Sequence, residues 1–263
     1  DTDYQVSGNW TNEGTLTFVA GRLALIDDGL FLNRGTFEVQ NASAADRVTG
    51  TGRFVNEGTL RKAAGAPTFA LDSTGFENTG AIELDSGTIS VANAFSNAGT
   101  IALAAGTELV AADALTNAET ATLSGSGTVT VVTGLTNLGR IAPGDDDTRA
   151  TLTIAGDTVF GASGRIDIDL ESETVFDVLA IEGVATLGGL LNATEVGGFE
   201  TEVGQTFDVV TYASRVGAFD DVQASAGDLF RLPVEGATAA TFDVLATDNF
   251  FVWVGGDGLW QDA

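Results

Sequence analysis

The heptapeptide Phe54-Val55-Asn56-Glu57-Gly58-Thr59-Leu60 carries the pattern on which the architecture of this chain depends. An apolar residue stands two positions before the asparagine, another stands four positions after it, and a glycine lies between them. Asparagine tolerates left-handed backbone angles and glycine adopts positive φ without a Cβ clash, so the two together suit a tight corner. The heptapeptide therefore predicts two short strands that meet at a turn and direct their apolar side chains into one core.

This pattern recurs through the first half of the chain, with one degenerate copy around Asn117. Successive asparagines are 19 to 23 residues apart. That period is too short for a helix-pair repeat, and no leucine-rich consensus accompanies it. The asparagines of the seven copies are Asn12, Asn33, Asn56, Asn78, Asn97, Asn117 and Asn137.

A second strand signal lies between successive asparagine corners. Residues 87–91 (GTISV) and residues 127–131 (GTVTV) alternate apolar with polar side chains, which places one face inward and the other outward. A coil of three short strands and three turns accommodates both signals within about 20 residues. The sequence therefore predicts an all-β fold, a right-handed parallel β-helix solenoid with irregular β-rich coils at its C-terminal end.

We expect three regions along the chain, because the repeat dissolves after Gly144. Residues 1–156 are expected to form the regular coils with Asn-x-Gly-Thr corners. Residues 157–249 are expected to form a less regular β-helix continuation or a capping region. Residues 250–263 are expected to be a linker or the start of another module.

Equal spacing would stack the repeat asparagines from one coil to the next. Each amide could then bond the amide of the neighbouring coil and form a ladder. The alternative is an outward row of asparagines that binds sugar. The apolar flanks of each copy favour the ladder, because they place the motif at a corner of the core.

The composition excludes several classes of function. The chain has 37 acidic and 11 basic residues, a formal net charge of -26, so we expect repulsion from nucleic acid and from anionic membranes. Histidine and cysteine are absent, which removes the commonest general base and all thiolate chemistry. No run of ~18 apolar residues occurs, so no membrane insertion is expected. Methionine is absent even at position 1, so we expect a processed product or an excised fragment.

The densest acidic cluster is Asp145-Asp146-Asp147. Calcium prefers several oxygen ligands, which such a loop could supply. Neither an EF-hand spacing nor a calcium-binding nonapeptide repeat accompanies the cluster. A solvated turn is therefore the alternative, and we expect no cofactor other than calcium.

Asp167 and Asp169 are the candidate catalytic pair, because they share one face of a strand. Glycosidases place two carboxyls about 5 to 9.5 Å apart, and this spacing could reach the lower bound. A polysaccharide lyase also needs a basic residue nearby, whereas the one basic patch, within residues 47–62, lies far away in sequence and is expected to be a solvated face. Any polar strand face yields such acidic pairs, so we expect no catalysis.

Two later segments extend the pattern: residues 177–191 (DVLAIEGVATLGGLL) and residues 204–212 (GQTFDVVTY). Together with the repeat they resemble, over about residues 9–222, the end of the passenger region in autotransporter-type and related large bacterial surface proteins. The resemblance implies secretion, display on the bacterial cell surface, and adhesion or scaffolding.

We therefore expect a structural or adhesive module of a secreted bacterial cell-surface protein, part of an adhesin stalk, a surface layer or an extracellular filament. Its expected partners are further copies of itself, neighbouring modules of the same protein, and surface glycans. The alternatives are a carbohydrate-active β-helix, either a polysaccharide lyase or a hydrolase, and a calcium-dependent assembly module.

Overall fold

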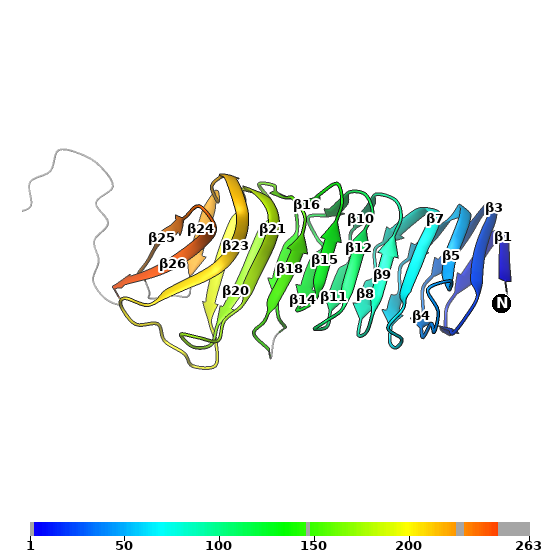
Figure 1. The fold of residues 1–263 in the computed structure, drawn as a ribbon, viewed down its shortest axis with the longest axis horizontal. Helices are drawn as coiled ribbons and strands as arrows, with labels where there is room; N and C mark the ends of the chain where they lie inside the picture. The colour runs from blue at the N-terminus through cyan, green and yellow to red at the C-terminus, as the bar shows by residue number, and fades with distance from the viewer. Residues whose placement is uncertain (1–2, 146–147, 225–228, 247–263) are drawn as a thin grey trace, which may run out of the picture.

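The computed structural model describes residues 3–145, 148–224 and 229–246. Over these residues the chain forms 26 strands and no helix; accordingly, this part of the chain offers no helix that could cross a membrane. Strands of successive coils lie side by side along one long axis, so the molecule is a rod of stacked coils (Figure 1). The solenoid has about nine turns at a spacing of about 22 residues.

All the strands belong to two sheets that run along the rod. The larger sheet contains β1 (Asp3–Asn12), β3 (Arg22–Asn33), β5 (Arg47–Asn56), β7 (Thr68–Asn78), β9 (Thr88–Val91), β10 (Phe95–Asn97), β12 (Glu108–Ala111), β13 (Leu115–Asn117), β15 (Thr128–Val131), β16 (Leu135–Asn137), β18 (Thr151–Ala155), β19 (Thr158–Phe160), β21 (Val178–Leu187), β23 (Thr206–Gly217), β25 (Leu229–Glu235) and β26 (Ala239–Ala246). The smaller sheet contains β2 (Thr15–Phe18), β4 (Thr36–Val39), β6 (Thr59–Lys62), β8 (Ala81–Leu84), β11 (Thr100–Leu103), β14 (Thr122–Gly125), β17 (Arg140–Pro143), β20 (Arg165–Leu170), β22 (Leu190–Glu195) and β24 (Asp221–Ala224).

The larger sheet turns around one corner of each coil and so forms two of its three sides. β7 pairs with β9 through Thr68–Leu71 and with β10 at its last residue, Asn78. β21 likewise pairs with β18 through its first half and with β19 through its second half. The smaller sheet forms the third side. Each coil therefore has three strand segments, although in some coils one long strand of the larger sheet, such as β21, supplies two of them.

Neighbouring coils pair in parallel and in a matched register. Phe54 lies between Phe31 and Phe76 in the larger sheet, and the repeat asparagines align in the same way. Consecutive hairpins would have paired antiparallel. The prediction of an all-β parallel solenoid is therefore confirmed.

An aromatic column fills the core of the first coils. The rings of Phe31 and Phe54 stack with centroids 4.9 Å apart and an interplanar angle of 14°, and Phe76 follows 5.9 Å from Phe54. Phe37 meets both Phe31 and Phe54 edge-on, at 5.5 and 5.4 Å. Each of these rings is buried, and burial of one such side chain stabilises the fold by about 1.5–3 kcal/mol.

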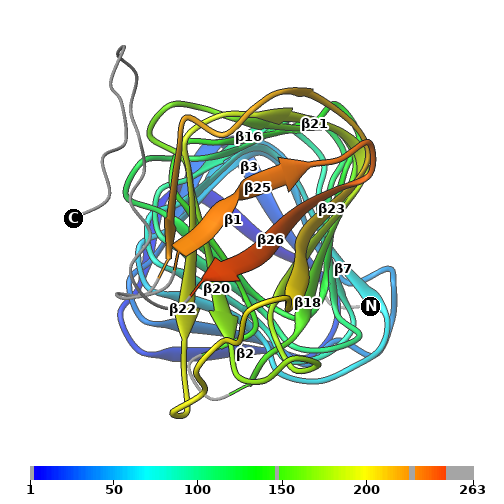
Figure 2. The ribbon, with the colours of Figure 1, turned by 90° about the vertical axis from the view of Figure 1, so that its left-hand side faces the viewer.

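The last two strands depart from the coil pattern. β26 pairs antiparallel with both β23 and β25, and Figure 2 shows β25 and β26 crossing the end of the solenoid in front of the coils. Phe242 and Val244 of β26 are buried together with Phe207 of β23. These strands therefore cover the core at this end. Residues 250–263, expected to be a linker or a further module, lie outside the described residues.

The corner glycines stack closely, which predicts a position-dependent effect of alanine. A Cβ built on Gly58 lies 2.1 Å from the carbonyl oxygen of Gly35, whereas a Cβ built on Gly14 meets nothing within 4 Å. We expect Gly58→Ala to lower the free energy of unfolding by about 3 kcal/mol, because the neighbouring corner must shift. Gly14→Ala, at the same repeat position, is the control and should change it by less than about 1 kcal/mol. Urea titration of the two variants measures the difference, and equal losses would contradict this packing.

Candidate functional site

The seven repeat asparagines form one axial row at a corner between the two sheets. Each of the first six donates its Nδ2 to the Oδ1 of the asparagine in the next coil, over distances of 2.7 to 2.9 Å. The same amide nitrogens also reach backbone carbonyls; Asn56 Nδ2, for example, lies 2.8 Å from the Ala81 oxygen. A continuous chain of amide hydrogen bonds therefore joins seven coils.

The asparagine row faces the interior of the rod. From Asn33 to Asn137 its side chains are at most 1% exposed. A buried polar group without a partner costs about 1–3 kcal/mol, so the hydrogen bonds between coils are what make this polar column compatible with the core. A row that binds sugar would need exposed amides, and these amides face away from solvent.

The row has a direction and two unlike ends. Phe160 takes the position after Asn137 in the parallel register, and Asn137 Nδ2 donates to the Gly139 oxygen at 3.0 Å. At the other end, Asn12 donates to Asn33, while within the described residues its Oδ1 accepts a single hydrogen bond, from the Gly14 N–H at 3.3 Å. The ladder thus ends at Asn137 on one side, and Asn12 is its first member within the described residues.

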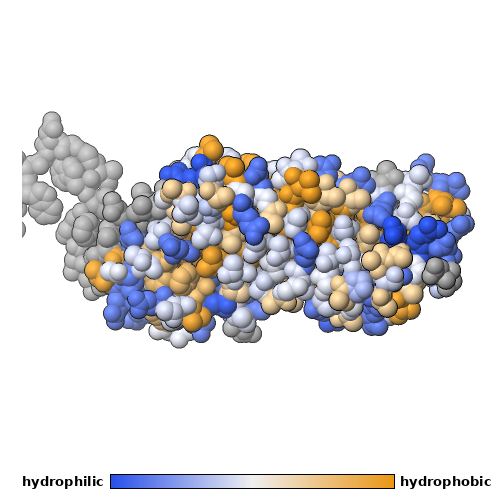
Figure 3. Space-filling view, viewed as in Figure 1, coloured by the Kyte–Doolittle hydropathy of each residue, from blue (hydrophilic) through white to orange (hydrophobic). Residues whose placement is uncertain are grey.

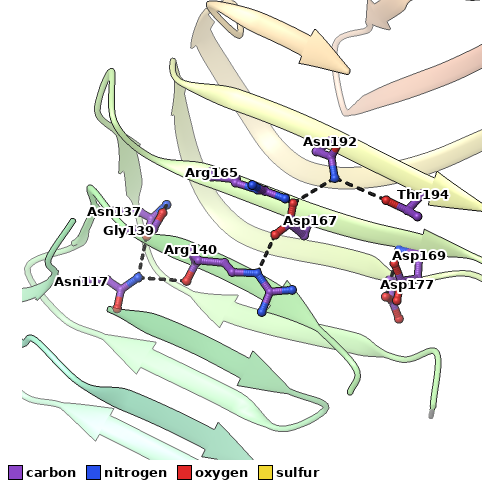
Figure 4. A network of polar contacts seen from close by, with 10 residues as sticks. All are labelled: Asn117, Asn137, Gly139, Arg140, Arg165, Asp167, Asp169, Asp177, Asn192 and Thr194. Atoms are coloured by element: carbon purple, nitrogen blue, oxygen red, sulfur yellow. Dashed lines mark hydrogen bonds and ion pairs between the residues drawn. The ribbon is translucent and has the colours of Figure 1, made fainter. Parts of the chain in front are cut away.

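The densest polar network outside the ladder surrounds Asp167 on β20 (Figure 4). Its carboxylate accepts hydrogen bonds from Arg140 Nε and Arg165 Nε, both at 2.5 Å, and from Asn192 Nδ2 at 3.0 Å. These donors come from three consecutive coils. Asp167 is only 8% exposed, so the two guanidinium groups offset the cost of burying its charge.

The neighbouring acids hold the loop that leads into β18. Arg149 binds Asp169 Oδ2 through Nη1 at 2.5 Å and donates to the backbone oxygen of Asp145 through Nη2 at 2.8 Å. Asp177 accepts the N–H of Ala150 at 2.8 Å and the N–H of Asp169 at 3.1 Å. The ion pair of Arg149 and the hydrogen bond from the Ala150 N–H therefore fasten this loop to the next coil, while the bond from the Asp169 N–H holds Asp177 in place within that coil.

A cavity of about 230 Å³ lies beside Asp167 and Asp177. Within the described ranges, no group of three or more acidic side chains is arranged to hold a metal ion. Of the expected calcium ligands, Asp145 lines this cavity, whereas Asp146 and Asp147 lie outside the described residues.

The arginines beside the acids were missed in the sequence analysis. Arg140 and Arg165 occupy the same position in consecutive coils, at a place where most copies of the repeat have threonine. Asp167 follows Arg165 by two residues and so shares its strand face. The departure from threonine was the available signal, but the register between coils was needed to use it.

The basic patch within residues 47–62 had been expected to be a solvated face, but the structure divides it into exposed arginines and a buried lysine. Three arginines in this range pair with acidic residues of the next coil, but Lys62 is fully buried. Its Nζ donates to Asn41 Oδ1 at 2.9 Å and to the Gly65 oxygen at 2.6 Å. Burial lowers the pKa of this amine, and its hydrogen bonds connect loops inside the solenoid.

Asp177 should make stability depend on pH in a specific direction. Burial raises the pKa of its carboxyl from 3.8 to about 6, against the lowering effect of its two N–H donors and Arg149. Between these values the folded state binds a proton that the unfolded state releases, so stability falls as pH rises through the window. The charged form at neutral pH carries a penalty of about 3 kcal/mol.

Asp177→Asn removes this titration, and urea unfolding at pH 5 and pH 7.5 tests it. We expect the wild type to lose about 1 kcal/mol relative to the variant between these two pH values. The comparison avoids the isoelectric region near pH 4.1. A wild-type-to-variant difference that does not change with pH would show that Asp177 does not titrate in this range.

Comparisons with known proteins add no assignment to this geometry. No protein-family model matches the chain, and no curated protein matches it either. The function is therefore argued from the fold and from its polar networks.

Proposed function

We propose that this chain is a structural or adhesive module of a secreted bacterial cell-surface protein, and that it performs no catalysis. It would serve as part of an adhesin stalk, a surface layer or an extracellular filament. The observation that carries the proposal is the asparagine ladder, which links seven coils along the axis of the rod.

The fold suits a part that spans distance and bears load. Strands stack along the axis at about 4.8 Å, so backbone hydrogen bonds are parallel to the direction in which a stalk is pulled. At the boundaries between the first coils, several strand pairs, the aromatic column and the asparagine row resist separation together. Each coil rests on its neighbours, so the stacking of coils itself holds the length of such a rod.

The surface charge supports an extracellular role. A net charge of -26 favours solubility of a long β surface, and it disfavours nucleic acid as a partner. The partners that we propose are neighbouring modules of the same protein, further copies of the chain, and surface glycans.

Electron microscopy of the full-length product, together with antibody labelling of intact cells, tests this proposal. We expect extended rods or a surface coat that antibodies against this chain can label. A compact particle confined to the cell interior would overturn it.

A carbohydrate-active module is the second candidate, because a cavity brings carboxylates and arginines together. Arg140, Asp167 and Asp169 line this cavity. A polysaccharide lyase requires basic and acidic side chains close together in this way. The engagement of Asp167 by two arginines argues against a nucleophilic role. Release of unsaturated or reducing sugars from acidic polysaccharides, lost in Asp167→Ala and Asp169→Ala, would establish this activity; no release across a broad panel would remove it.

A further inference from the structure

Arg140 and Arg165 form the one cluster among the described residues in which two arginines share a single carboxylate, that of Asp167. Every other ion-paired arginine of the described residues has at least one carboxylate that it shares with no other arginine. In a chain with a formal net charge of -26, two guanidinium groups on one acid are a local excess of positive charge. Such an excess suits a ligand that carries an anionic group.

The register between coils holds the two guanidinium groups side by side. Arg140 of β17 and Arg165 of β20 are paired residues of adjacent strands, which lie about 4.8 Å apart. Each donates its Nε to Asp167, so the shared carboxylate fixes the orientation of both. Within the described residues neither guanidinium has another hydrogen-bond partner, and the Nη groups of Arg140 lie on the side away from Asp167 (Figure 4). The two Nη groups of a guanidinium form a fork that can bind one carboxylate through two hydrogen bonds.

The cavity of about 230 Å³ beside Arg140 also offers hydrogen-bond acceptors. Asp169 binds Arg149 through Oδ2, and within the described part of the chain its Oδ1 accepts no hydrogen bond. The cavity therefore places the free fork of an arginine near the free oxygen of an aspartate. The aspartates that line it are Asp145, Asp167, Asp169 and Asp177.

This mixture of donors and acceptors discriminates among anions. Three arginines accompany the four aspartates, so carboxylates outnumber guanidinium groups by one. A ligand that carries only acceptors, such as sulfate or an acidic side chain, would be repelled by these carboxylates. A carboxylated sugar brings an anionic group for an arginine and hydroxyl donors for the aspartates. The cavity is smaller than most sites for drug-sized ligands, about 300–1,000 Å³, so it suits a single sugar residue.

Apolar recognition has less support on the surface. Contiguous apolar patches are the usual mark of a docking surface for another protein. On the side of the rod seen in Figure 3, hydrophobic residues are scattered among hydrophilic ones. The observations therefore favour a polar ligand over an apolar partner.

We propose that this cavity binds one uronic acid residue of an acidic glycan, whose carboxylate pairs with the Nη groups of Arg140 and whose hydroxyls donate to Asp169. Arg165 adds positive charge from the next coil, and Asp167 is the positioning residue that orients both guanidinium groups. The Arg140 side chain is 48% exposed, so a glycan reaches it from solvent. The inference rests on the proposed function, because it names the class of surface glycan that an adhesive module would hold.

Isothermal titration calorimetry of the full chain at pH 7.5 tests the site, with trigalacturonate, trimannuronate and a hyaluronan tetrasaccharide as probes. We expect saturable binding of at least one of them. Its fully methyl-esterified form keeps the hydroxyls but loses the charge, so it should bind at least about tenfold more weakly. Sodium sulfate and triglutamate keep negative charge without the hydroxyls, so neither should displace the bound glycan at equal concentration. Failure of all three glycans to bind, or displacement by either competitor, would overturn the proposal.

Arg140→Lys keeps a positive charge beside Asp167 but removes the planar fork, so it should weaken glycan binding about tenfold. Arg34→Lys is the matched control, because Arg34 is similarly exposed and pairs with Glu57 in another part of the rod; its affinity should equal that of the wild type. Equal affinities for the wild type and Arg140→Lys would overturn the assignment to this cavity. The comparison among glycans uses the unmodified chain, so it decides the proposal even where a variant fails to fold.

Product analysis after the titration separates binding from catalysis. We expect the glycan to be recovered intact; release of unsaturated or reducing ends would assign the site to a lyase or hydrolase and overturn a purely adhesive role. None of these measurements depends on cell-surface display. Rods on cells whose purified chain binds no uronate would overturn this inference alone, whereas a chain that binds uronates but stays inside the cell would overturn the proposed function alone.

Discussion

Asn78→Asp is expected to destabilise the protein by about 3–5 kcal/mol at pH 8, although it changes one amide group to a carboxylate of the same shape. In the native chain Asn78 accepts from Asn56 Nδ2 and donates to Asn97 Oδ1, each at 2.7 Å. The aspartate keeps the first bond but turns the donor into a charged acceptor that faces Asn97 Oδ1. That charge is buried in the amide row, and none of the hydrogen-bond partners of Asn78 is a cationic side chain.

The loss should shrink as the pH falls. A buried carboxyl takes up a proton more readily than an exposed one, and the protonated acid can donate to Asn97 Oδ1 as the amide did. Urea unfolding of Asn78→Asp at pH 8 and pH 5 should therefore show partial recovery at pH 5. Asn93→Asp is the control: Asn93 is exposed and bonds the Ser73 oxygen of the adjoining coil, so its loss should stay below about 1 kcal/mol. Equal losses in both variants would mean that the row contributes no more than any surface amide.

Phe54→Ala is expected to lower the free energy of unfolding by about 3–5 kcal/mol. Phe54 is fully buried and touches three other rings, Phe31, Phe37 and Phe76. Removal of its ring leaves a cavity in a column whose neighbours are fixed by the strand pairing above and below. The site cannot collapse without breaking that register, so the cost should lie near the upper part of the range.

Urea titration gives the size of this loss, and hydrogen exchange gives its location. A solenoid is stabilised mainly between neighbouring coils, so exchange should rise first in β3, β5 and β7. Phe54→Leu retains much of the volume and should cost about 1 kcal/mol. A loss below about 1 kcal/mol for Phe54→Ala, or exchange that rises evenly along the rod, would contradict the packing described above.

The coil and its corner could be predicted from local sequence. The Asn-x-Gly pair marks the corner, but neither residue adopts the positive φ that had been expected there. The glycine is required because a Cβ would meet the backbone of the preceding corner, and the apolar residues on either side select the core. Because the pattern repeats at nearly equal spacing, identical positions must meet when coils stack. The buried row from Asn33 to Asn137 and the aromatic column at Phe31, Phe54 and Phe76 both follow from that spacing.

The polar networks could not be predicted in this way. Arg140 and Arg165 surround Asp167 only because their strands pair in one particular register. Lys62 reads as part of a basic cluster, yet alternation along β6 turns it inward between Val39 and Leu84. The loop that precedes β18 has no repeat, so its attachment to Asp177 has no local signature.

By itself, then, the sequence determined the period of the coil, the positions of its corners and the residues that face the core, because the same local pattern of apolar residues, asparagine and glycine recurs in nearly every repeat. Tertiary structure alone decided which charged groups meet, that Lys62 is buried, and that β25 and β26 cross the end of the coils. The physical reason is that these features depend on contacts between coils of unequal length and on a reversal of strand direction, neither of which a local pattern encodes.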